Sequence, residues 1–189
     1  MKPKIFIRVF FIACIAAYPF LVYFGIRHFS PSFFGLALAV LLAMRFGVLV
    51  PEERPVLLPV LIVFLGYAIT AAILKSTPML LFYPALVNFS LCAVFLNSLR
   101  QEEPLLLRII RARGVTVSIH GPKYLYRLTA IWAGFFAING SIAIWTSTVS
   151  MEAWTLYNGL ISYFIVAALI GVEWIFRRHY KKRKGVYSP

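Results

Sequence analysis

Apolar runs of about twenty residues recur along almost the whole sequence. A run of this length is what a helix needs to cross a hydrocarbon core of ~30 Å. Hydrocarbon cannot hydrogen-bond a peptide group, so each unbroken run must be helical. We predict an all-α polytopic membrane protein, a six-transmembrane-helix bundle that forms one integral membrane domain over residues 1–189. The predicted spans are 5–26, 31–50, 56–74, 79–97, 128–149 and 154–176.

Composition supports this class and disfavours nucleic acid as a partner. Hydrophobic residues make up 61% of the chain and the mean hydropathy is +0.85, more than a soluble domain of this length can bury. The net charge is +13. With six spans and both termini in the cytoplasm, all 19 Lys and Arg residues except Arg27 and Lys75 fall on the cytoplasmic side. This is the positive-inside pattern, and it includes a basic tail at 177–189 that can also contact acidic lipid headgroups.

The segment 98–127 is the only long polar loop that we predict. Pro104 suits the first turn of a helix, and Gly114 can end it with a positive φ, so we expect a short helix over 104–113. Its predicted apolar face carries Leu105, Ile109 and Ala112, with Leu106 and Ile110 adjoining, and the opposite face carries Arg108 and Arg111. Such an amphipathic helix is expected to lie flat at the cytoplasmic interface. A docking helix for a partner protein is the alternative.

Polar side chains occur at specific depths inside the predicted spans. Asn88 and Asn139 both fall near mid-depth, where they can meet. In the last span, Asn158, Ser162 and Glu173 share a face, and Glu173 is one turn from Arg177, which predicts an i,i+4 pair. Intramembrane amides serve either as interhelical contacts or as ligand partners, and an intramembrane carboxylate more often has a function.

The span 128–149 has two specialised faces. One face carries small residues within roughly 60° of each other, namely Ala130, Gly134, Ala137 and Ser141. The opposite face carries Trp132, Asn139 and Thr146. Small residues let a second helix approach closely, so we expect this span to contact neighbouring helices on both faces.

Three stretches resemble a family of uncharacterised bacterial inner-membrane proteins that belong to aryl polyene, xanthomonadin-like pigment clusters. They are YPALVNFSLCAVFLNSL (83–99), YRLTAIWAGFFAINGSIA (126–143) and WTLYNGLISYFIVAALIGVEWIFRR (154–178). The matching positions are Tyr83, Pro84, Asn88, Arg127, Thr129, Trp132, Asn139, Trp154, Tyr157, Asn158, Gly159 and Glu173. The part RLT..W..FF is also distantly similar to septation protein A. The resemblance implies the bacterial inner membrane and a polyene acyl chain destined for a membrane lipid, but it assigns no reaction. It does not extend to the loop segment QEEP.

Enzymatic activity is disfavoured by the residues that are missing. The chain has no Asp, its three His residues (28, 120 and 179) fall outside the predicted spans, and no metal-ligand spacing or GxSxG motif occurs. We therefore predict no cofactor and no metal. The favoured hypothesis is a membrane accessory protein that binds or passes on a lipid-like acyl product, with membrane lipids and that product as partners. The candidate binding residues are Asn88, Arg127, Trp132, Asn139, Tyr157, Asn158 and Glu173.

Two other functions remain open from the sequence. One is a non-catalytic scaffold that recruits cytoplasmic biosynthetic enzymes through the basic helix at 104–113. The other is a proton-coupled carrier that uses Glu173, because an ionisable group inside a span is the usual element of a proton relay.

Overall fold

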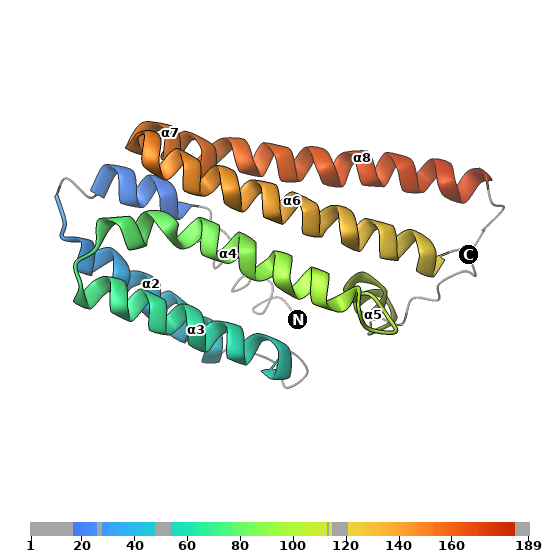
Figure 1. The fold of residues 1–189 in the computed structure, drawn as a ribbon, viewed down its shortest axis with the longest axis horizontal. Coiled ribbons are helices and arrows are strands. Elements are labelled where there is room, and N and C mark those ends of the chain that lie inside the picture. Colours follow the sequence, from blue (N-terminus) through green and yellow to red (C-terminus); the bar gives the residue numbers. More distant parts are fainter. Residues whose placement is uncertain (1–16, 26–27, 48–53, 113, 115–120, 184–189) are drawn as a thin grey trace, which may run out of the picture. The chain divides into compact units, whose positions relative to one another are not determined.

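The structure is a computed structural model that describes residues 17–25, 28–47, 54–112, 114 and 121–183. Every regular element in these residues is a helix, which confirms the predicted all-α class for them (Figure 1). A helix over 17–25 is followed by α2 (Pro31–Gly47), α3 (Arg54–Ile73), α4 (Thr77–Ser98), α5 (Leu105–Ala112), α6 (Gly121–Val149), α7 (Met151–Leu156), a π-helical turn (Tyr157–Ile161) and α8 (Ser162–Arg183).

Three helices among the described residues are long and apolar enough to cross a membrane. They are Thr77–Ser98, Gly121–Val149 and the continuous helix Met151–Arg178. The chain is therefore a helical membrane protein. Shorter apolar helical stretches occur at Pro31–Ala43 and Leu61–Ile73, and most of the predicted span 5–26 lies outside the described residues. The structure thus supports three spans, and the count of six stays a prediction.

The described residues pack as two compact units. The first contains the described residues among 1–84 together with 143–159, and the second contains the described residues among 85–142 and 160–189. In the second unit, α4, α6 and α8 lie side by side, and α5 lies where α4 ends and α6 begins (Figure 1). This second unit holds most of the candidate site.

In the first unit, α2 and α3 approach closely at a glycine. A Cβ atom added at Gly35 would lie only 2.8 Å from the backbone nitrogen of Ala72. Ser32 Oγ donates a hydrogen bond of 2.7 Å to the carbonyl of the same Ala72. A missing side chain thus allows backbone contact, which is a main source of helix association in lipid.

Pro84 lies inside α4, and the carbonyl groups near it are bonded to other helices. Because proline has no N–H, the carbonyl of Leu80, four residues earlier, loses its usual donor. The Tyr18 hydroxyl donates to that carbonyl at 3.1 Å, and Trp154 Nε1 donates to the neighbouring carbonyl of Leu81 at 2.8 Å. The proline in α4 therefore connects this helix to two others through buried aromatic donors.

A π-helical turn separates α7 from α8. Tyr157, Asn158 and Gly159 are buried in this turn, and a Cβ at Gly159 would lie 2.7 Å from the ring of Phe20. The wider turn changes the angular register of the helix. The face that we predicted for Asn158, Ser162 and Glu173 assumed a uniform α-helix, and that assumption was wrong across this turn.

Candidate functional site

Asn88 on α4 and Asn139 on α6 are hydrogen-bonded to each other. Asn139 Nδ2 donates to Asn88 Oδ1 at 2.9 Å, and Asn139 is only 6% exposed. The predicted meeting of the two amides is confirmed. The absence of a side chain at Gly140 lets α4 and α6 approach closely enough for this bond, because a Cβ there would lie only 3.1 Å from the Cβ of Asn88. The bond joins α4 to α6, so this pair acts as an interhelical contact.

A double-mutant cycle measures the strength of this contact. Asn88→Leu and Asn139→Leu should each lower the unfolding free energy by about 1 kcal/mol, because each removes the hydrogen bond between the two amides. The double variant should show a coupling energy of about 0.6 kcal/mol, the average for hydrogen bonds between membrane helices. Stability can be measured by SDS titration followed by far-UV circular dichroism. A coupling energy of zero would show that the bond adds nothing to stability.

Asn158 belongs to the first unit and has partners there. Its Nδ2 donates to the carbonyl of Trp154 at 2.9 Å and approaches Thr146 Oγ1 at 3.4 Å. Tyr157, the neighbouring candidate residue, is also buried. The structure thus brings Asn88 and Asn139 together, and it gives Asn158 partners of its own. The sequence did not distinguish these two arrangements, because all three amides have the same chemistry.

Glu173 on α8 binds side chains from two helices. Its Oε1 accepts a hydrogen bond of 2.9 Å from the Tyr124 hydroxyl on α6 and pairs with Arg177 Nε at 3.5 Å. The i,i+4 pair with Arg177 was predicted and is confirmed. Tyr124 was missed, since it is 49 residues away and no local pattern indicates the contact. The ring of Tyr124 also stacks on Phe176, so this cluster anchors α8 to the start of α6.

Trp132 belongs to an aromatic cluster on α6. It contacts Phe135 and Phe136 with ring centroids 5.7 Å apart in both cases, and Phe136 meets Phe95 of α4 edge-on at 5.3 Å. The small-residue face behaves differently from our expectation. Ala130, Gly134 and Ser141 are exposed among the described residues, so the prediction that a helix covers this face was wrong for the part of the chain that the structure describes.

The short helix α5 is fastened to the end of α4 by Ser98. The Ser98 hydroxyl accepts the N–H of Leu105 at 3.1 Å and donates to the carbonyl of Phe95 at 2.7 Å. The predicted helix and the positive φ at Gly114 are found, with α5 at Leu105–Ala112 and φ of 73°. However, Leu107 is the buried side chain, at 3% exposure, while Ile109 is 39% exposed. The sequence prediction did not include Leu107 in the apolar face of this helix, and the structure shows that Leu107 is the side chain that packs against the protein.

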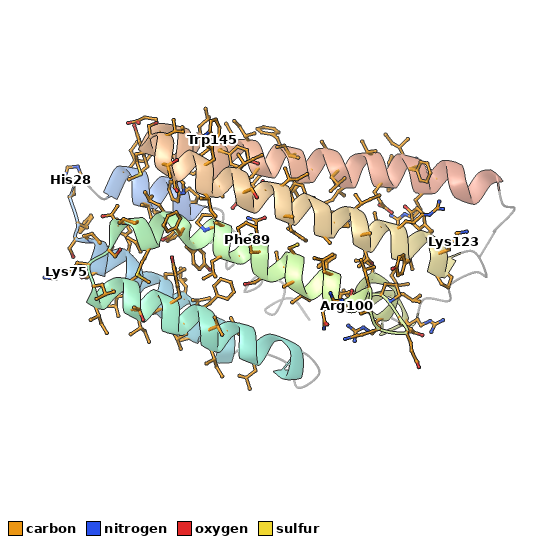
Figure 2. The ribbon with its side chains drawn as sticks, in the orientation of Figure 1. His28, Lys75, Phe89, Arg100, Lys123 and Trp145 are labelled. Carbon is orange, nitrogen blue, oxygen red and sulfur yellow. The ribbon has the colours of Figure 1, made fainter. Side chains whose placement is uncertain are left out.

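An open cleft of about 470 Å³ lies between the residues that begin α5 and those that begin α6. Arg100 and Lys123 mark this end of the second unit, next to α5 (Figure 2). The lining residues are Glu102, Pro104, Leu107, Pro122, Lys123, Tyr126 and Arg127. Two prolines, a leucine and a tyrosine ring thus surround two cations and one carboxylate.

The two cations of the cleft differ from two basic residues nearby, which are paired with carboxylates. Arg111 forms an ion pair with Glu103, and Arg177 with Glu173. Lys123 and Arg127 are exposed, and neither forms an ion pair with any residue that the structure describes. They stand one helical turn apart on α6, so both charges point to the same side. The sequence had singled out Arg127, but it missed Lys123 and Tyr126. The cleft forms only where the start of α5 lies near the start of α6, and no sequence pattern indicates that contact.

No group of three or more His, Cys, Asp or Glu residues that could hold a metal ion occurs in the described part of the chain. No family model, no curated protein and no solved structure matches this sequence. The fold and the cleft define a helical membrane protein with a basic, partly apolar site at one end of a spanning helix.

Proposed function

We propose that this chain is a multi-pass accessory protein of the bacterial inner membrane that binds a lipid-like acyl product and passes it on. In this proposal the chain has six spans and cytoplasmic termini, and the product is an aryl polyene, as the sequence resemblance implies. The observation that carries the binding function is the cleft, in which Lys123 and Arg127 stand beside apolar side chains at the start of α6.

The chemistry of the cleft matches that of an anionic amphiphile. Such a ligand needs a cation for its head and a continuous apolar surface for its tail, at the depth where water meets hydrocarbon. Lys123 and Arg127 can form charge-assisted hydrogen bonds with a carboxylate or a phosphate. Leu107, Pro104 and the ring of Tyr126 provide apolar contact for the first part of the chain.

The distribution of charge on the spanning helices supports a cytoplasmic position for the cleft. Arg100 follows the end of α4, Lys123 and Arg127 are at the start of α6, and Arg177 is near the end of α8. Lys75 alone precedes α4 at its opposite end. Cytoplasmic flanks of spans carry the excess of Lys and Arg, so the basic ends are assigned to the cytoplasm.

The other two hypotheses gain less support from the geometry. A scaffold that recruits enzymes through the basic face of α5 would use Arg108 and Arg111, but Arg111 is already paired with Glu103. A carrier would use Glu173, but that carboxylate is held by both Tyr124 and Arg177. In the cleft, by contrast, neither cation forms an ion pair with a described residue.

The test is native mass spectrometry with lipidomics on protein purified in mild detergent from its own membranes. Wild type should retain an acyl lipid, and the variant carrying Lys123→Ala and Arg127→Ala should retain at least tenfold less. Each cation near an anionic group contributes about 1 kcal/mol, so the loss of two exceeds the ~1.4 kcal/mol that a factor of ten requires. Arg108→Ala is the matched control, because Arg108 is exposed on α5 but does not line the cleft. Equal occupancy in wild type and the double variant would refute the proposal.

A further inference from the structure

Glu102 brings a negative charge to a cleft whose other charged side chains are cationic. It lies in the segment that links α4 to α5, whereas Lys123 and Arg127 stand on α6. All three side chains line the cleft, and all three are exposed. A ligand that fills the cleft therefore meets charges of both signs.

These charges do not neutralise one another. Glu102 forms no ion pair with Lys123, with Arg127 or with any other residue that the structure describes. The carboxylate next to it is different, because Glu103 is paired with Arg111. Glu102 is thus the carboxylate just before α5 whose charge is left for a ligand.

The backbone on both sides of Glu102 is fixed by hydrogen bonds to Ser98. The N–H of Gln101 donates to the Ser98 carbonyl at 3.2 Å, and the N–H of Leu105 donates to the Ser98 hydroxyl at 3.1 Å. Pro104, which also lines the cleft, is buried. The link between α4 and α5 is therefore held in place before a ligand arrives, which lowers the ordering cost of binding.

A ligand with a purely anionic head group would leave Glu102 without a partner. Its negative charge would be attracted by the two cations and repelled by the carboxylate, since all three line the same cleft. An ammonium group removes this conflict, because it has three N–H donors that a carboxylate accepts. The cleft volume of about 470 Å³ falls within the usual range for small-molecule sites, so it has room for a whole head group rather than one ion.

We infer that the ligand of the cleft has a head group with both a phosphate and a primary ammonium, as in an aminophospholipid. The phosphate binds Lys123 and Arg127 through charge-assisted hydrogen bonds, and the ammonium binds Glu102. This inference rests on the proposed function and specifies the head group of its ligand. The carboxylate of Glu102 beside two cations carries the inference, because no other head-group chemistry of an anionic lipid pairs all three charges.

The test compares two lipids that share their acyl chains and a phosphodiester but differ in the amine. Phosphatidylethanolamine has the amine, and phosphatidylglycerol lacks it. Each lipid is titrated into full-length, delipidated protein, and bound lipid is counted by native mass spectrometry. Wild type should prefer phosphatidylethanolamine, and Glu102→Gln should lower the ratio of the two affinities at least tenfold, which corresponds to about 1.4 kcal/mol. An unchanged ratio overturns the inference.

Glu152→Gln is the matched control for this experiment. Glu152 is an exposed glutamate in the first turn of α7, and it does not line the cleft. The control should therefore keep the affinity ratio of wild type, and a fall equal to that of Glu102→Gln would overturn the assignment to the cleft. Far-UV circular dichroism verifies that each variant is folded.

Two further ligands test the head group on wild type alone. Phosphatidylcholine has the same phosphate, but its quaternary ammonium has no N–H, so it should bind less tightly than phosphatidylethanolamine. Equal affinity overturns the hydrogen-bonded amine. Water-soluble glycerophosphoethanolamine should not displace the lipid at equal concentration, and displacement would assign the site to a soluble phosphoamine instead of a lipid.

The cation variant separates this inference from the proposed function. If Lys123→Ala with Arg127→Ala weakens binding of both lipids but Glu102→Gln leaves their ratio unchanged, the amine is wrong and the proposed function stands. If Glu102→Gln changes the ratio but the cation variant binds both lipids as wild type does, the phosphate position and the proposed function are wrong. If neither variant changes binding, both proposals are wrong.

Discussion

Replacing Trp154 with Ala is expected to lower the unfolding free energy by about 3–5 kcal/mol, the cost of truncating a large buried aromatic side chain. Trp154 is 0% exposed, so truncation leaves a cavity that the surrounding helices can fill only in part. It also removes the donor to the carbonyl of Leu81, close to the proline in α4. Both losses fall on the same contact between α7 and α4.

Two further variants separate the cavity from the hydrogen bond. Trp154→Phe keeps most of the ring volume and removes only the N–H, so we expect a loss of about 1 kcal/mol. Trp145→Ala is the matched control, because Trp145 is 64% exposed and its removal should change stability by less than ~0.5 kcal/mol. SDS titration followed by far-UV circular dichroism measures all three. Equal losses for Trp154→Ala and Trp145→Ala would contradict the packing described for α7.

Adding one methyl group at Gly35 is expected to be the second most damaging change. The new Cβ of Gly35→Ala would lie 2.8 Å from the backbone nitrogen of Ala72 and 2.9 Å from its Cα. A backbone atom cannot rotate away, so α2 and α3 must separate, and the hydrogen bond from Ser32 to Ala72 lengthens. We expect a loss of about 3 kcal/mol, at the upper end of the usual range for overpacking.

Gly66→Ala on α3 is the control for this prediction. A Cβ at Gly66 meets nothing within 4 Å, and alanine favours a helix interior by up to ~1 kcal/mol over glycine. The two glycine-to-alanine changes should therefore act in opposite directions in the same SDS titration. If Gly35→Ala proves neutral, α2 and α3 do not approach as closely as the structure shows.

Some contacts were predictable because they depend on simple counting along helices. Residues four apart on a helix are neighbours, so the pair between Glu173 and Arg177 followed from the sequence. Depth within a span was enough to bring Asn88 and Asn139 to the same level, where they bond. Counting failed at the turn Tyr157–Ile161, because a π-helical turn does not follow the period of an α-helix.

Other features were not predictable, because burial in protein and exposure to lipid both favour apolar side chains. The hydrophobic pattern of α5 shows that it is amphipathic, but it does not show that Leu107 packs inward while Ile109 is exposed. The small-residue face around Gly134 gave the same ambiguity. It suits a neighbouring helix or a ligand equally well, and only the structure shows it uncovered among the described residues.

The sequence by itself determined that this protein is helical and belongs in a membrane, because long apolar segments in hydrocarbon must satisfy their backbone groups internally. It also determined which ends of the helices are basic. Only the tertiary structure decided that Lys123 and Arg127 line a cleft. The cleft forms because the start of α5, which is hydrogen-bonded to Ser98, lies near the start of α6. Such a contact joins segments whose spacing carries no periodic signal, so packing alone creates the site.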